Sequence, residues 1–180
     1  MNIKVTVFIF FTFLFSGCAN IGLPNDYAYI SDINRDINKV KYVDDYSNYG
    51  VRDYYATTQE FYKNGGDCED YSLAKYVRLR RLGITPERLW LVFGHNSGGG
   101  HAVLMFIMEN GREYLLDNNY NYAIPTPTSK FRPSYRFNEN GIVYAYKEDN
   151  FESEVYVGNF SEEDMSRINA VFFELSDLKH

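Results

Sequence analysis

The hydrophobic pattern of the chain changes character at Pro86, and this change most limits the fold. Before it, apolar residues recur at helical spacing, most clearly in residues 68–83, CEDYSLAKYVRLRRLG, which follow Asp67 as a capping residue and end at Gly83. After it, short apolar runs are separated by turn residues, which is the pattern of strands joined by hairpins. The sequence therefore predicts an α+β domain, with helices first and an antiparallel sheet after them.

Further elements follow from the same periodicities. Helices are also expected over residues 29–46, 58–62 and 161–178, and strands over residues 89–93, 102–108, 114–116, 135–137, 142–146 and 154–157. Asn110-Gly111 predicts a two-residue hairpin turn, which would place His101 opposite residue 120 and close to Asp117. Residues 96–100, NSGGG, are expected to form a mobile loop beside the site, and residues 118–133 a loop rich in proline.

The first 17 residues, MNIKVTVFIFFTFLFSG, carry one Lys and then an uncharged stretch that is too short to span a bilayer. This pattern predicts a signal peptide over residues 1–17. Residues 15–18, FSGC, resemble a bacterial lipoprotein signal, which implies acylation of Cys18, and Ala19 resembles lipoproteins that are sent to an outer membrane. Residues 18–26 would then be a lipidated tether, residues 27–180 the folded domain, and the periplasmic face of the outer membrane its location. The alternative is an ordinary cleaved signal with a chance cysteine.

Charge and cysteine content narrow the class of function. The chain has 180 residues, of which 45% are hydrophobic, enough for one packed core. Its 18 Lys+Arg against 24 Asp+Glu argue against nucleic acid as a partner, because phosphate neutralisation needs a basic face. If Cys18 is acylated, Cys68 is the one remaining cysteine, and it is either a small buried hydrophobic residue or a nucleophile.

Cys68, His101 and Asp117 form a candidate catalytic set. A thiol at a helix N-terminus faces unpaired N–H groups and the positive end of the helix dipole, which favour the thiolate. A neighbouring imidazole can take the thiol proton, and a carboxylate on the far ring nitrogen holds the tautomer. His95 is the alternative base, although it precedes a flexible Asn-Ser-Gly stretch.

The spacing of these residues resembles a known family. The matching segments are Gly66-Asp67-Cys68-Glu69-Asp70-Tyr71, Ala74-Lys75-Tyr76, Leu82-Gly83, His101-Ala102-Val103-Leu104 and Leu116-Asp117-Asn118. They resemble the bacterial transglutaminase-like cysteine proteinases, the periplasmic group that includes LapG-type adhesin proteases, over most of residues 30–146. The resemblance implies a papain-like, transglutaminase-like fold and a Cys68–His101–Asp117 triad.

The acids beside the cysteine suggest a cation. Asp67, Glu69 and Asp70 place negative charge around Cys68, which opposes thiolate formation unless a cation or the imidazolium offsets it. A hard cation bound by oxygens would do so, and the resemblance implies that Asp67 and Glu69 are calcium ligands. The alternative is that the acids only cap the helix start; for Asp70 we expect a structural role.

The expected function is therefore that of a thiol endopeptidase of the bacterial envelope. The resemblance implies an exported protein as substrate, a large surface adhesin in particular, and a regulatory inhibitor protein is a further partner to seek. Two alternatives remain open: amide transfer through the same acyl-enzyme, and a non-catalytic envelope binding module with the same fold.

Overall fold

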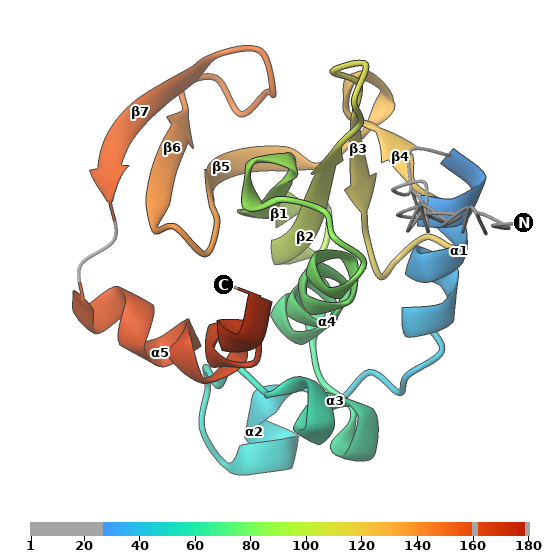
Figure 1. Ribbon diagram of the computed structural model, residues 1–180, viewed down its shortest axis with the longest axis vertical. Helices are drawn as coiled ribbons and strands as arrows, with labels where there is room; N and C mark the ends of the chain where they lie inside the picture. The colour runs from blue at the N-terminus through green and yellow to red at the C-terminus, as the bar shows by residue number, and fades with distance from the viewer. Residues whose placement is uncertain (1–26, 160–161, 179–180) are drawn as a thin grey trace, which may run out of the picture.

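Helices occupy the first part of the described chain and strands most of the rest (Figure 1). The structure is a computed structural model that describes residues 27–159 and 162–178. The predicted signal peptide, Cys18 and the tether lie outside these residues. Within them, no helix is both long enough and apolar enough to cross a membrane.

Four helices precede the sheet: α1 (Tyr27–Ile37), α2 (Asp45–Tyr49), α3 (Thr58–Asn64) and α4 (Cys68–Arg81). The single helix expected over residues 29–46 is wrong, because α1 ends at Ile37 and a separate helix begins at Asp45. Two interactions, one distant in sequence and one local, explain the break. Tyr42 forms a parallel bridge with Gly66, and the Asp44 side chain accepts the Ser47 N–H at 3.0 Å, so that it caps α2.

The expected antiparallel sheet is confirmed, with seven strands in the order β4-β3-β2-β1-β5-β6-β7. Their bounds are β1 (Leu89–Asn96), β2 (Gly99–Ile107), β3 (Glu113–Leu116), β4 (Ile124–Pro125), β5 (Arg132–Phe137), β6 (Ile142–Tyr146) and β7 (Glu154–Asn159). A last helix, α5 (Glu162–Phe173), closes the fold and is followed by a 3-10 turn over Ser176–Leu178. The expected start of this helix at Ser161 lies outside the described residues.

Two of the expected loops contain regular structure. The pairing of β1 with β2 continues to Asn96 and Gly99, so only Ser97 and Gly98 form the turn, and the expected mobile loop over residues 96–100 is wrong. Backbone pairing makes no demand on side chains, so the glycines that suggested a loop extend the ladder here, and Gly99 adopts a φ of 118° next to the turn. The stretch 118–133 contains β4 and a 3-10 turn over Thr126–Thr128.

The turn between β2 and β3 also differs from the prediction by one residue. Met108 donates its N–H to the Arg112 carbonyl at 2.8 Å, so three residues form the loop, with Gly111 at a φ of 78°. A three-residue loop that ends in a left-handed glycine is a common hairpin connection. It pairs Leu104 with Leu116 and Ile107 with Glu113.

Helix α4 lies centrally against β1 and β2 (Figure 1), and the sheet buries apolar side chains on both faces. Leu104 and Phe106 pack with Leu73 and Val77 in the core that includes α4. A second cluster includes the alternate residues of the central strands and comprises Trp90, Val92, Val103, Met105, Leu115, Ile124, Phe131 and Tyr146. Burial on both faces explains why the strand segments are continuous apolar runs rather than alternating ones.

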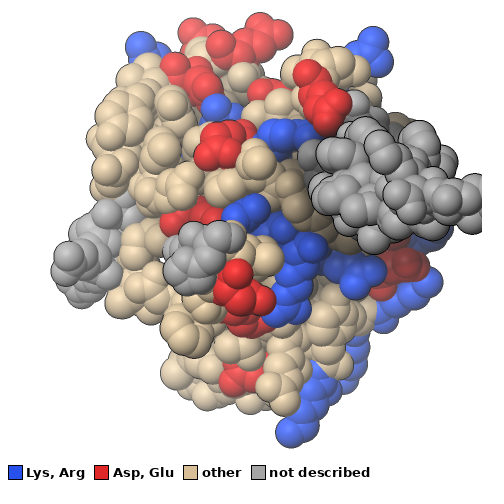
Figure 2. All heavy atoms as spheres, in the orientation of Figure 1, with Lys and Arg blue, Asp and Glu red and all other residues tan. Residues whose placement is uncertain are grey.

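Charged side chains of both signs are spread over the face shown in Figure 2, and Lys and Arg gather near its centre, where the view looks onto α4. The last turn of α4 carries Arg78, Arg80 and Arg81, and its first turn carries Glu69 and Asp70. This distribution complements the helix dipole at both ends. Arg80 also forms a paired ion contact with Glu139, with both N···O distances at 3.0 Å.

Candidate active site

The start of α4 is held by a glycine and a buried carboxylate. Asp70 accepts the Ala56 N–H at 2.8 Å and the Asp67 N–H at 3.3 Å, so it ties the helix start to the segment before α3. A side chain at Gly66 would overlap the Asp70 carboxylate and lie 2.7 Å from its Cβ. Gly66 therefore permits the close approach that places Cys68 at the first position of the helix.

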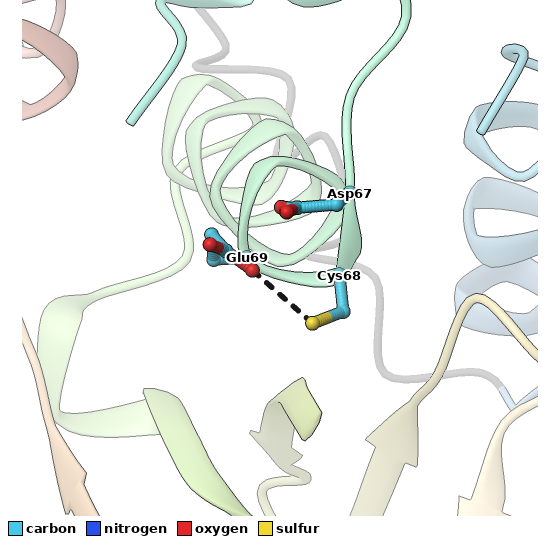
Figure 3. Close-up of side chains that lie close together, drawn as sticks. All are labelled: Asp67, Cys68 and Glu69. Atoms are coloured by element: carbon cyan, nitrogen blue, oxygen red, sulfur yellow. Dashed lines mark hydrogen bonds between the residues drawn. The ribbon is translucent and has the colours of Figure 1, made fainter. Parts of the chain in front are cut away.

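Cys68 is partly buried, and its thiol donates to the Glu69 carboxylate at 3.1 Å (Figure 3). Burial and then the negative charge of Glu69 raise the pKa of the Cys68 thiol, while a hydrogen bond from the Ala102 N–H acts in the opposite direction. Burial and the charge of Glu69 therefore oppose the thiolate, whereas the position at the helix N-terminus was expected to favour it. The Ala102 contact also places the sulfur next to the residue that follows His101.

His101 and Asp117 form a buried pair. The His101 Nε2 atom lies 2.9 Å from Asp117 Oδ1, and the two residues are 9% and 4% exposed. Asp117 Oδ1 also accepts the Asn119 N–H at 2.9 Å, and the Asn119 side-chain nitrogen lies 3.1 Å from Nε2. Because Nε2 is engaged by the carboxylate, Nδ1 is the ring nitrogen that remains for proton exchange.

The three-residue turn is what permits this pair. With the two-residue turn, Asp117 would oppose Leu104 and point to the other face of the sheet from His101. In the observed register Leu104 pairs with Leu116, so Asp117 follows beside Val103 and shares a face with His101. A shift of one residue in register thus brings the two side chains together.

Carboxylates crowd the start of α4. Among the described residues, three groups could each hold a cation, because the ligand atoms within each group lie within 4.8 Å of one another. The groups are Asp67, Cys68 and Glu69; Asp45, Asp53 and Glu69; and Asp45, Asp67 and Asp70. Asp67 is the N-cap residue of α4, and Glu69 lies in the first turn of the helix (Figure 3). Burial, together with like charge from Glu69 and Asp45, raises the pKa of Asp67 to about 9 and that of Asp70 to about 7.

The sequence that forms this site matches a known protein family. A model of the bacterial transglutaminase-like cysteine proteinases (BTLCP) matches residues 22–138, which include Cys68, His101 and Asp117. The chain belongs to this family. A search of curated proteins found no match.

Solved structures of LapG from Legionella pneumophila resemble this cysteine proteinase. The EGTA-treated form is 20% identical, with a TM-score of 0.63, over 82% of this chain and 78% of LapG. The calcium-bound form is 25% identical, with a TM-score of 0.60, over 78% of this chain and 79% of LapG. The transglutaminase-like fold is therefore confirmed, and the chain is a transglutaminase-like cysteine peptidase.

Two clefts of the peptidase meet near His101. A cleft of about 580 Å³ is lined by His101 together with Tyr42, Tyr71 and the β1–β2 turn. A larger one of about 1200 Å³ is lined by Asp117, Phe131 and the segments 95–98, 126–132 and 149–152. The β1–β2 turn borders both clefts. His95, the alternative base, lies at the rim of the larger one, with its side chain 42% exposed and Nε2 3.9 Å from Asp149.

Two asparagines support the site in roles that were not predicted from the sequence. Asn38 donates to the Asp117 and Tyr120 carbonyls at 3.0 and 2.8 Å, and Asn34 donates to the Tyr120 carbonyl at 2.7 Å. Both hold the segment that follows β3. Their spacing of four residues places them on one side of α1 and its end, a signal that was visible in the sequence but has no meaning without a partner segment.

Asp45 also belongs to the acidic cluster, although the sequence did not predict it there. Asp45 is buried and accepts the Tyr54 N–H at 2.6 Å through Oδ2. Its Oδ1 atom and that of Asp67 are buried without a hydrogen-bond partner in the described part of the chain. Buried acceptors without donors are what a cation site offers, so the residues present fit an oxygen-coordinated ion.

Proposed function

We propose that this cysteine peptidase is a thiol endopeptidase of the bacterial envelope that uses a Cys68–His101–Asp117 triad on an exported protein. The observation that carries the proposal is the buried His101–Asp117 pair, one residue from the N–H group that contacts the Cys68 sulfur. Family membership supports a protein substrate. A large surface adhesin is the proposed substrate, and a regulatory inhibitor protein a further partner.

The chemistry follows from the roles of the three side chains. His101 takes the thiol proton as the Cys68 sulfur attacks the scissile carbonyl, and Asp117 holds the imidazole so that Nδ1 faces the reaction. His101 then gives the proton to the leaving amine, and the C–N bond breaks to leave an acyl-enzyme. Water, deprotonated by His101, attacks this thioester and restores the thiol.

We propose calcium as the ion of the acidic cluster. Asp67 and Glu69 would hold it, with Asp45 as a third ligand, and the calcium-bound form of LapG supports the choice. Positive charge there would offset the carboxylates that raise the pKa of the Cys68 thiol. Hard divalent cations with flexible coordination suit such an oxygen-only set.

The predicted signal segment supports a lipid anchor on Cys18. Acylation there would hold the peptidase at the periplasmic face of the outer membrane, close to membrane-held substrates. Mass spectrometry of the chain isolated from membranes tests this, since an acylated N-terminal Cys18 is expected. An unmodified N-terminus at another residue would contradict the anchor.

Alkylation of Cys68 tests the triad. With the chain from residue 19 onward, which includes the whole described fold, intact mass would follow alkylation across pH with calcium and with a chelator. We expect a rate that stays high well below the ordinary thiol pKa of about 8.5. A thiol that reacts only at high pH in both conditions would contradict the proposal and favour the binding module.

Product mass separates hydrolysis from amide transfer. Incubation with exported adhesin fragments and a primary amine should give two products whose masses account for the addition of one water. Incorporation of the amine into the product would favour amide transfer instead. Cys68→Ser is the matched control, because it keeps the shape of the site and removes the thiol.

A further inference from the structure

Lys75 is a fully buried cation that the proposed reaction does not use. It lies on α4 with 0% of its surface exposed, and its Nζ atom donates to the Leu116 carbonyl at 3.1 Å. The Tyr71 ring lies one turn earlier on the same helix, with its centroid 5.7 Å from Nζ. An ammonium group in such a place has lost its water and gained one carbonyl bond, which is unfavourable unless a charge nearby compensates.

That charge is Asp117. The carbonyl that Lys75 binds belongs to the residue directly before Asp117, and the ammonium interacts by charge with the buried carboxylate that holds His101. Among the described residues, Tyr71 of α4 and Asp117 at the end of β3 are the titratable groups that contact Lys75 or act on its charge, and His101 of β2 is coupled to it through Asp117. Burial lowers the pKa of Lys75 to about 7, although the negative charge of Asp117 acts in the opposite direction, so the ammonium form predominates below pH 7.

We infer that Lys75 is a positioning residue of the peptidase, whose buried positive charge balances Asp117 and keeps His101 neutral and able to accept the thiol proton. The inference rests on the proposed triad. Without this charge, the buried carboxylate would be compensated by a proton on the imidazole. An imidazolium that is held in this way cannot take a further proton from Cys68.

Nuclear magnetic resonance titration of His101 measures this coupling directly. The titration uses Cys68→Ala chains from residue 19 onward, so that the thiol does not contribute, and the His101 Cε1–H signal is identified by its loss in His101→Gln. Lys75→Met removes both the charge and the hydrogen bond, Lys75→Gln keeps a donor for the Leu116 carbonyl, and Lys75→Arg keeps the charge. His95 and His180 serve as internal references.

We expect the pKa of His101 to rise by about one unit in both Lys75→Met and Lys75→Gln, as for loss of a unit charge near a poorly solvated pair. Lys75→Arg should leave it near the value of the parent chain. An unchanged pKa in Lys75→Met and Lys75→Gln would overturn the inference. A shift in Lys75→Met without one in Lys75→Gln would overturn it too, because the hydrogen bond and not the charge would then be the cause.

Two further measurements keep the result decisive. If Lys75→Met does not fold, Lys75→Gln carries the test, and the charge-matched double variant Lys75→Met/Asp117→Asn should recover a native spectrum. The proposed triad is tested separately by alkylation of Cys68 with Lys75 intact. Alkylation that does not depend on His101 would refute the triad even where the His101 pKa responds to Lys75, so the two failures are distinguishable.

Discussion

The two halves of the site differ in how completely the protein itself satisfies their charges. At the β2–β3 end, Asp117 accepts from His101 and from the Asn119 N–H, and both side chains are buried in a fixed arrangement. At the start of α4, Asp45 and Asp67 each bury a carboxylate oxygen that has no donor in the described part of the chain. The base of the proposed triad is therefore held by hydrogen bonds within the fold, whereas the proposed nucleophile lies beside a cluster of carboxyl groups.

The two halves of the site have to meet two different requirements of catalysis. The imidazole needs a fixed orientation, which hydrogen bonds between protein groups provide. The thiol needs a lower pKa, and Glu69 acts against it by charge and by a hydrogen bond at 3.1 Å. A cation at the acidic cluster can remove that opposition without moving the histidine, so the peptidase could be controlled at one half of its site only.

The largest expected effect is at the organised half. His101→Ala should lower the rate of Cys68 alkylation at pH 6 by about a hundredfold in calcium, because the thiol loses its base. His95→Ala is the matched control and should leave the rate unchanged, since that side chain is half exposed at the cleft rim. Equal losses in both variants would contradict the assignment of His101.

Gly66→Ala should break the start of α4. A Cβ at this position would overlap the Asp70 carboxylate, so we expect the free energy of unfolding to fall by about 2 kcal/mol, as for other overpacked sites. Gly100→Ala is the control, because a Cβ there meets nothing within 4 Å. Urea denaturation of the two variants measures the difference, and equal stability would contradict the tight contact between Gly66 and Asp70.

Calcium should act on the unorganised half alone. A chelator should slow Cys68 alkylation at pH 6 about tenfold, equivalent to about one unit of thiol pKa. Glu69→Gln should react faster than the parent in chelator, because it removes the negative charge that raises the thiol pKa and replaces the carboxylate with a weaker amide acceptor, and it should lose its response to calcium.

Asp36→Asn is the control for this effect. Its carboxylate is exposed and pairs with Lys39 on α1 and its end, outside the acidic cluster. Its alkylation rate should respond to calcium as the parent does. A chelator effect of the same size in Glu69→Gln and in the parent would show that the ion acts elsewhere.

The smallest expected effect is on the way in which the free energy of unfolding depends on pH. Asp67 and Asp70 have pKa values raised to about 9 and about 7 in the folded chain, against about 4 when unfolded. The folded state therefore binds more protons between pH 4 and 7, and the free energy of unfolding should decrease as pH rises through this range. We expect about 1 kcal/mol less at pH 7 than at pH 5 in chelator, after allowance for the partial exposure of Asp67.

Thermal and urea unfolding at the two pH values measure this slope. Asp67→Asn should reduce it, and saturating calcium should reverse it, because the ion binds the ionised carboxylates. A stability that rises from pH 5 to pH 7 in chelator would mean that the acidic cluster is compensated by protein groups. In that case protein groups would satisfy the charges of both halves of the site, and the two halves would not differ in this respect.

Much of the fold could be predicted because periodicity reports burial directly. The apolar stripe of residues 68–83 and the apolar runs after Pro86 led to α4 and to the central strands. The helix expected over residues 29–46 failed because Asp44 caps a new helix and Tyr42 pairs with Gly66, a contact 24 positions away. Local periodicity does not contain such distant pairings.

The candidate site could also be predicted only in part from the sequence. Cys68, His101 and Asp117 were found by residue type, spacing and family resemblance, whereas the roles of the supporting residues were not predicted. Asn38, Asp45 and Lys75 are ordinary polar residues in the sequence. Their roles depend on what lies across from them: the Asp117 carbonyl, the Tyr54 N–H and the Leu116 carbonyl.

The sequence by itself determined the α+β class, the helix that begins at Cys68 and the identity of the three candidate catalytic residues, because these depend on local pattern and chemical type. Only the tertiary structure decided the register that puts His101 and Asp117 on one face, since one residue in a turn reverses every side chain of a strand. It also decided that Lys75 binds the carbonyl before Asp117 and that Asp45 lies beside Asp67. Burial and long-range packing set these charges against one another, and neither can be read from neighbouring residues alone.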